Sequence, residues 1–130
     1  MARRYIIVGL GFALLGLLLG IYMAASQNHL QMVAHAHILL VGFVLNFVYG
    51  TLYHVWQLPD DTTLAKVQFY AHQTGAVVLS AGLFMLYGQM APMQVLDPIL
   101  AIASLAILAG MIIMKVHYVK STRKTPTAVA

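Results

Sequence analysis

The chain has 130 residues, of which 62% are hydrophobic and only 8% are charged, and its mean hydropathy is +0.86. This composition excludes an ordinary soluble globular domain and predicts that lipid covers much of the surface. The formal charge is +4 and there is no cysteine, which excludes disulfides, iron-sulfur clusters and thiolate metal sites. Because the basic residues stand at predicted helix ends, we expect no nucleic-acid partner.

Four apolar segments follow one another along the chain. Each is long enough to cross a bilayer whose hydrocarbon core is about 30 Å thick. The segments extend over about residues 5–25, 32–56, 64–88 and 98–119.

Three short connections separate these segments and contain polar residues, Pro or a helix cap, at 26–28, 58–63 and 91–98. Connections this short join antiparallel neighbours. The sequence therefore predicts an all-α, up-down-up-down membrane bundle that forms one domain over residues 1–120, followed by a cytoplasmic tail at 121–130.

The basic residues predict the orientation of this bundle. They all fall on the side that holds both termini, at Arg3, Arg4, Lys66, Lys115, Lys120, Arg123 and Lys124. Since positive residues accumulate on the cytoplasmic side, we expect both termini to be cytoplasmic.

Small residues recur along two of the segments. The first carries Gly9, Ala13, Gly16 and Gly20, and the third carries Gly75 and Gly82. Ridges of this kind predict close helix packing within the membrane.

The second segment carries His35 and His37 about one turn inside its outer end. At about 100° per residue, positions two apart point about 160° away from each other, so the pair cannot hold one metal ion from one helix. Each histidine must face its own neighbour. This arrangement suits a helix that lies between two cofactors or two subunits.

The two sides of this segment also differ in character. The His37 side continues into the aliphatic residues Val41, Val44, Val48, Leu52 and Val55. The His35 side continues into the small and polar residues Gly42, Asn46, Tyr49 and Tyr53. An aliphatic wall beneath a histidine packs against a porphyrin as well as against lipid, so two alternatives stay open: cofactor ligation, or hydrogen bonds across a helix interface.

His72 lies in the third segment, about 12 Å from its predicted cytoplasmic start. An ionisable side chain at that depth is costly and is a functional candidate. Because adjacent segments are antiparallel, His72 falls toward the inner leaflet and His35 and His37 toward the outer one, so one mononuclear site cannot contain all three. A second ligand site, a proton relay and a hydrogen bond to Asn46 or Tyr49 are the alternatives for His72.

The other histidines lie near the predicted membrane surfaces. His54 stands beside Tyr53 and Trp56, where an aromatic belt is expected, with a role in a second metal site as the alternative. His29 falls in an outer connection and His117 at the inner end of the fourth segment, where we expect solvated or interfacial side chains.

Parts of two segments resemble the catalytic subunit of heme-copper oxidases. The second segment is similar to the tenth helix of that subunit in His35-Ala36-His37, Gly50 and His54-Val55-Trp56, and the third is similar, more loosely, to the next helix in Gln68-Phe69-Tyr70, Gly75 and Gly88. The family subunit arranges twelve helices as three arcs of four. The resemblance therefore implies one arc, a homotrimer that rebuilds the whole, and a place in a bacterial inner membrane.

The resemblance also implies a cofactor, because the two histidines of this motif ligate two hemes in the family. In a homotrimer, heme b would lie at each interface between His35 of one subunit and His37 of the next. The residues then expected beside the porphyrin are Val41, Gly42 and Val44.

The implied function is a membrane b-type cytochrome that transfers electrons or holds heme for a partner, with a quinol or a cytochrome as electron partner. The family's copper ligands lie on other helices, so copper at His72 or His54 would depart from its pattern. Two alternatives stay open: a small oxygen- or nitric oxide-reducing enzyme, and a non-heme accessory or copper-handling membrane protein.

Overall fold

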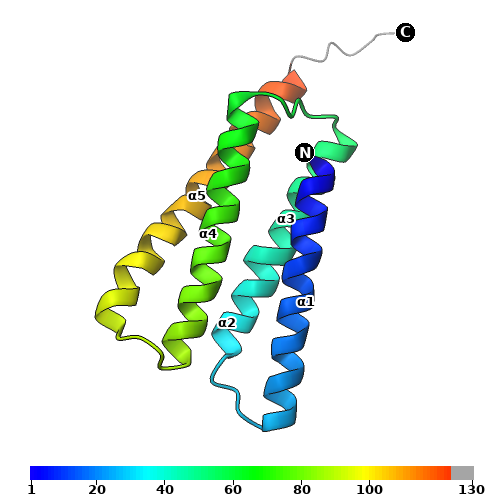
Figure 1. Ribbon diagram of the computed structural model, residues 1–130. Coiled ribbons are helices and arrows are strands. Elements are labelled where there is room, and N and C mark those ends of the chain that lie inside the picture. Colours follow the sequence, from blue (N-terminus) through cyan, green and yellow to red (C-terminus); the bar gives the residue numbers. More distant parts are fainter. Residues whose placement is uncertain (124–130) are drawn as a thin grey trace.

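The computed structural model describes residues 1–123, which are helical apart from the connections between spans (Figure 1). The helices are α1 (Ala2–Ser26), α2 (Met32–His37), η1 (Ile38–Val44), α3 (Leu45–Val55), α4 (Thr63–Tyr87) and α5 (Met93–Arg123). Because α2, η1 and α3 are continuous, they form one span, Met32–Val55, called here the second span. The prediction of an all-α chain with four spans long and apolar enough to cross a membrane is confirmed.

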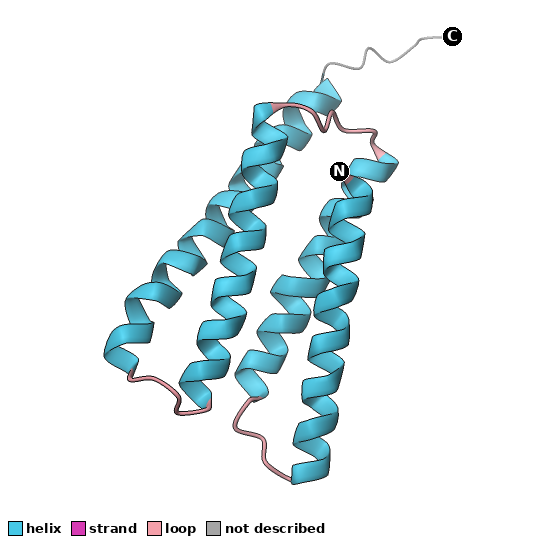
Figure 2. Ribbon diagram, viewed as in Figure 1, coloured by secondary structure: helices cyan, strands magenta, loops and turns pink. Residues whose placement is uncertain are grey.

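The spans run alternately up and down, and the connections between them are short loops (Figure 2). The second span packs between α1 and α4, and α4 packs between the second span and α5. Within the described chain the spans therefore form an arc with α1 and α5 as its outer members (Figure 1).

α5 begins earlier than the sequence predicts, at Met93 instead of residue 98, and it continues to Arg123 instead of 119. The carbonyl of Pro92 accepts hydrogen bonds from the amides of Val95 and Leu96, at 3.1 and 3.2 Å, and so starts the helix. Pro98 lies inside α5, beyond its first turn, so the missing N–H leaves the Gln94 carbonyl without its usual backbone donor, and the helix nevertheless continues. Of the predicted tail at 121–130, the first three residues belong to α5 and the rest lies outside the described residues.

The connection between the second span and α4 contains the predicted helix cap. The Thr62 hydroxyl accepts a hydrogen bond from the amide of Ala65 at 3.1 Å, which satisfies one of the free N–H groups at the start of α4. At the opposite end of the bundle, α1 stops at Gln27, whose φ of 56° is left-handed and cannot continue the helix.

The small-residue ridges let the spans approach closely, as predicted. A Cβ added at Gly9 of α1 would lie 3.1 Å from the Cβ of Asn46 in the second span. On α4, a Cβ at Gly75 would lie 3.0 Å from the carbonyl oxygen of Ala103 in α5. These glycines allow backbone and side chains of adjacent spans to touch without a clash.

The outward side of α1 is apolar and exposed. Its side chains Leu10, Leu14, Leu17, Leu18 and Ile21 are each more than half exposed. A contiguous apolar surface of this kind on a soluble monomer would cause association, whereas in a bilayer it contacts lipid.

Candidate functional site

His35 projects from α2 toward α1. Its Nδ1 lies 2.8 Å from the carbonyl oxygen of Gly16. Because a carbonyl can only accept, Nδ1 carries the proton and donates, and the neutral ring keeps its lone pair on Nε2. Gly20 provides room for the ring, since a Cβ added there would lie 3.0 Å from His35 Cε1. The glycine ridge of α1 thus orients His35 as well as packing the helices.

His37 is held by its own helix. Its Nδ1 donates to the carbonyl of Val33, one turn earlier, at 2.8 Å, so its lone pair is also on Nε2. Neither His35 Nε2 nor His37 Nε2 belongs to the fully buried, unpartnered atoms of residues 1–123, so both reach the surface of the chain. The two partly buried rings therefore have the same tautomer, with the proton on Nδ1, although carbonyls of different helices accept that proton.

The two sides of the second span differ in burial in the way that its sequence pattern suggests. The small and polar residues Gly42, Asn46, Tyr49 and Tyr53 are buried. The aliphatic residues Val44, Val48 and Val55 are exposed, and Val41 and Leu52 are partly buried. The polar side therefore belongs to the interior of this chain, and the aliphatic side is free to contact lipid, a cofactor or a second subunit.

The three residues expected beside a porphyrin have different surroundings. Gly42 packs against α1, because a Cβ added there would lie 2.3 Å from Cδ1 of Phe12. A cofactor reaches Gly42 only if the Phe12 ring moves. Val41 is partly buried and Val44 is exposed, so a group outside the chain can contact both.

A π-helical segment directly follows the two histidines. At the end of Ile38–Val44, the amide of Leu45 donates to the carbonyl of Leu40, five residues back. The return to the four-residue step in α3 leaves the Val41 carbonyl without a backbone donor. His72 of α4 supplies the missing donor, with Nε2 at 3.2 Å from the Val41 oxygen.

His72 therefore hydrogen-bonds neither Asn46 nor Tyr49, the two partners considered from the sequence. Its ring packs edge-on against Tyr49, with ring centroids 4.9 Å apart, and Gln73 donates to Asn46 instead. His72 is fully buried, and its Nδ1 has no partner among the described residues. Its available ring nitrogen is thus enclosed within the bundle, unlike those of His35 and His37.

Polar side chains continue from His72 toward the end of the bundle that holds the N-terminus. The Tyr5 hydroxyl donates to the side-chain oxygen of Gln68, and the Tyr5 ring packs against Tyr49 and Tyr53 with centroids 5.6 and 5.7 Å away. The Tyr53 hydroxyl and Gln68 Nε2 have no partner within residues 1–123. Buried polar groups in a membrane bundle are costly and are often functional.

The remaining histidines divide into exposed and buried. His29 and His54 are exposed, which agrees with the positions expected for them near the membrane surfaces. His117 was expected to be solvated or interfacial, and this prediction is wrong. Its side chain is 3% exposed, and Nε2 donates to the carbonyl of Pro59 at 3.0 Å. His117 thereby fastens the end of α5 to the connection before α4.

Sequence reasoning missed several members of the buried polar group. Gln68 was noted only as part of a family motif, and Tyr5 was read as the first residue of an apolar segment. The one available signal was the presence of uncharged polar residues inside apolar runs, which are rare at that depth and face the interior when they occur.

The number of side chains that come together limits how a metal could be held. Among residues 1–123, no three His, Asp or Glu side chains lie close enough to share a metal ion. A porphyrin supplies four nitrogens itself and needs only one or two protein ligands. A histidine whose Nδ1–H is bound by a carbonyl and whose Nε2 is free has the arrangement found in metal-ligating histidines. His35 and His37 therefore fit axial ligation of heme.

Comparisons with known proteins add no relative. No protein-family model, curated protein or solved structure matches the chain, so the similarity to heme-copper oxidases stays a resemblance carried by the motifs of the second and third segments.

Proposed function

We propose that this chain is a membrane b-type heme protein whose hemes lie between subunits of a homotrimer and transfer electrons. The observation that carries the proposal is the shared state of His35 and His37: in each, a backbone carbonyl accepts the Nδ1 proton, and Nε2 is free and reaches the surface. Both termini are proposed to face the cytoplasm of a bacterial cell.

Two ligands at different positions around one helix require two subunits for each heme. His35 is oriented by α1, whereas His37 is held within α2, so the rings do not converge in one chain. An interface between copies would bring His35 of one subunit toward His37 of the next. The exposed aliphatic residues Val44 and Val48 then provide apolar surface for the interface or the porphyrin.

The residues around each histidine have a defined role in this proposal. The Gly16 and Val33 carbonyls fix the tautomer, so that the lone pair of each ring is on Nε2. With His35 and His37 as its protein ligands, heme would supply one-electron transfer in preference to oxygen binding. A quinol or a cytochrome would serve as the electron partner.

Absorption spectra of the purified protein test heme binding directly. We expect a Soret band and a low-spin reduced spectrum in the wild-type protein, and loss of both in His35→Ala and His37→Ala. His29→Ala is the matched control, because His29 is an exposed histidine at the same end of the bundle. Full heme content in both variants would refute the proposal. A protein without heme would favour the accessory or copper-handling alternative.

Co-expression of the two variants tests the shared site. An interface formed by a His37→Ala subunit, which keeps His35, and a His35→Ala subunit, which keeps His37, contains both ligands. Random assembly in equal amounts would restore about a quarter of the interfaces in a cyclic trimer. Recovery of heme to about that level, with a trimer mass in native mass spectrometry, supports the interface site. No recovery in co-assembled trimers would contradict it.

Gas turnover separates the proposal from the enzyme alternative. A bis-histidine heme should turn over neither oxygen nor nitric oxide. Turnover of either gas by the purified protein, abolished by His72→Leu, would favour the enzyme with His72 at a second metal.

A further inference from the structure

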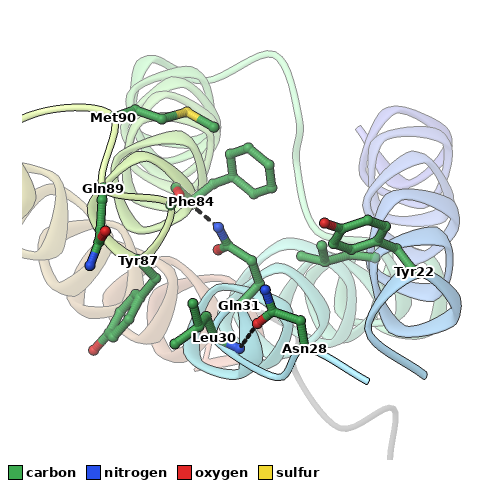
Figure 3. Close-up of a pocket in the computed structure, with 10 residues that line it drawn as sticks. Tyr22, Asn28, Leu30, Gln31, Phe84, Tyr87, Gln89 and Met90 are labelled. Atoms are coloured by element: carbon green, nitrogen blue, oxygen red, sulfur yellow. Dashed lines mark hydrogen bonds between the residues drawn. The ribbon is translucent and has the colours of Figure 1, made fainter. Parts of the chain in front are cut away.

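A cavity of about 400 Å³ lies at the end of the bundle opposite the N-terminus, between the connection after α1 and the end of α4 (Figure 3). Five of the ten residues that line it have polar side chains: Tyr22, Asn28, Gln31, Tyr87 and Gln89. None of the residues that line it is Lys, Arg, His, Asp or Glu. The cavity therefore suits an uncharged polar group, since a phosphate or an ammonium would lack a counter-ion.

An apolar groove of about 580 Å³ continues from this cavity between α1 and α4. Leu19 and Phe84 line both, so the two spaces adjoin. Along α1 the groove extends from Leu19 to Val8, about 16 Å of helix, which is close to half the thickness of a bilayer core. Apart from Ser80, its lining is apolar or glycine. Its length and chemistry match one lipid tail in one leaflet.

Gln31 links the connection after α1 to α4 and is only 8% exposed (Figure 3). Its amide nitrogen donates to the carbonyl of Phe84 at 3.0 Å, which sets the orientation of the amide group. Its amide oxygen has no partner among the described residues. A buried acceptor of this kind costs about 1–3 kcal/mol unless a donor pairs with it. Gln31 lines the cavity, so a small rotation of its buried amide oxygen toward the cavity would let a head group that donates a hydrogen bond supply that partner.

We propose that the cavity and the groove together bind one uncharged, single-tailed lipid whose head group donates hydrogen bonds. The single groove argues for one tail, the uncharged wall argues against a phosphate head group, and Gln31 argues for a donor. The lipid site does not depend on heme binding, so the two proposals stand or fall separately.

Photolabelling of the full chain in phosphatidylcholine nanodiscs tests this site. Nanodiscs are needed because sugar-headed detergents belong to the proposed ligand class. Three probes share one diazirine-bearing tail: a monoacylglycerol, the methyl ester that has no donor, and the charged lysophosphatidic acid. We expect labelling of groove peptides from α1 and α4, with the monoacylglycerol bound about five- to tenfold more tightly than either other probe.

Substitutions test separately which residues bind the head group and which bind the tail of the lipid. Gln31→Leu should reduce the affinity for the monoacylglycerol to that for the methyl ester. Gly11→Phe should weaken both, because Gly11 lines the groove and a Cβ there meets nothing within 4 Å, so the larger side chain fills the space without a backbone clash. Ala101→Phe, at an exposed position of α5, is the control and should leave labelling unchanged.

Several outcomes would overturn the proposal. Equal labelling by the three probes would show nonspecific contact with lipid. Unchanged binding in a folded Gln31→Leu variant would remove the head-group assignment, and if that variant does not fold, unchanged labelling in Gly11→Phe is enough to reject the site. Crosslinks from the groove to a second copy, without lipid labelling, would assign the groove to a subunit interface.

Discussion

His72 of α4 donates from Nε2 to the carbonyl of Val41, 3.2 Å away in the π segment of the second span. A side chain on one span thus completes the backbone hydrogen bonding of another. The carbonyl needs this donor because the change from a five-residue to a four-residue step leaves it unpaired in an apolar interior.

Replacement of His72 by Leu should therefore destabilise the bundle whether or not heme binds. The change leaves a buried carbonyl unsatisfied, at a cost of about 1–3 kcal/mol. The midpoint of thermal unfolding, followed by circular dichroism in detergent, measures this. His54→Leu is the control, because His54 is an exposed histidine of the second span. Equal midpoints for the two variants would mean that the His72 hydrogen bond contributes nothing to stability.

Enlarging Gly20 should disturb heme binding without removing a ligand. Gly20→Leu places atoms where the His35 ring lies, since even a Cβ would be 3.0 Å from Cε1. We expect a large loss of heme or a change from a low-spin to a high-spin spectrum. Gly11→Leu, on the same helix but facing open space, should keep the wild-type spectrum. Identical spectra for both variants would argue against His35 as a ligand positioned by α1.

Acid should release the proposed heme. An imidazole needs its Nε2 lone pair to ligate iron, so protons compete with the metal for that nitrogen and heme should be lost as the pH falls. A pH titration of the Soret band measures this, with far-ultraviolet circular dichroism at each pH to show that the helices persist. A Soret band that stays constant to the pH at which the helices unfold would contradict ligation by accessible histidines.

His117→Leu should also lower stability. His117 is buried and donates to the carbonyl of Pro59 at 3.0 Å, so the substitution removes a tie between α5 and the connection before α4. We expect a loss of about 1–3 kcal/mol and faster proteolysis of that connection. His29→Leu, an exposed histidine elsewhere, is the comparison. Limited proteolysis at equal rates in both would show that the tie is not needed.

The number and approximate limits of the spans were predictable, because a bilayer imposes a minimum length of apolar sequence. Close packing at Gly9 was predictable, since small residues in a row allow helices to approach, but its partner Asn46 was not. The inward side of the second span was also predictable from Asn46 and Tyr49, which are too polar to face lipid.

Other features depend on contacts between distant residues and left no local signal. The π segment has an ordinary apolar sequence, and its unpaired carbonyl is satisfied by a residue 31 positions later. His117 is buried because the connection before α4 folds over it, which its own neighbours in sequence do not reveal. Pro98 was read as a boundary, although α5 begins five residues earlier and continues through it.

The π segment has one more consequence, which concerns the angle between two halves of a single span. The segment contains one residue more than a regular helix would need, and a residue corresponds to about 100° of rotation. Deleting one residue from Ile38–Val44 would therefore turn His35 and His37 by about that angle relative to Asn46 and Tyr49. The extra residue therefore sets the direction in which the histidines of α2 point relative to the buried polar residues of α3.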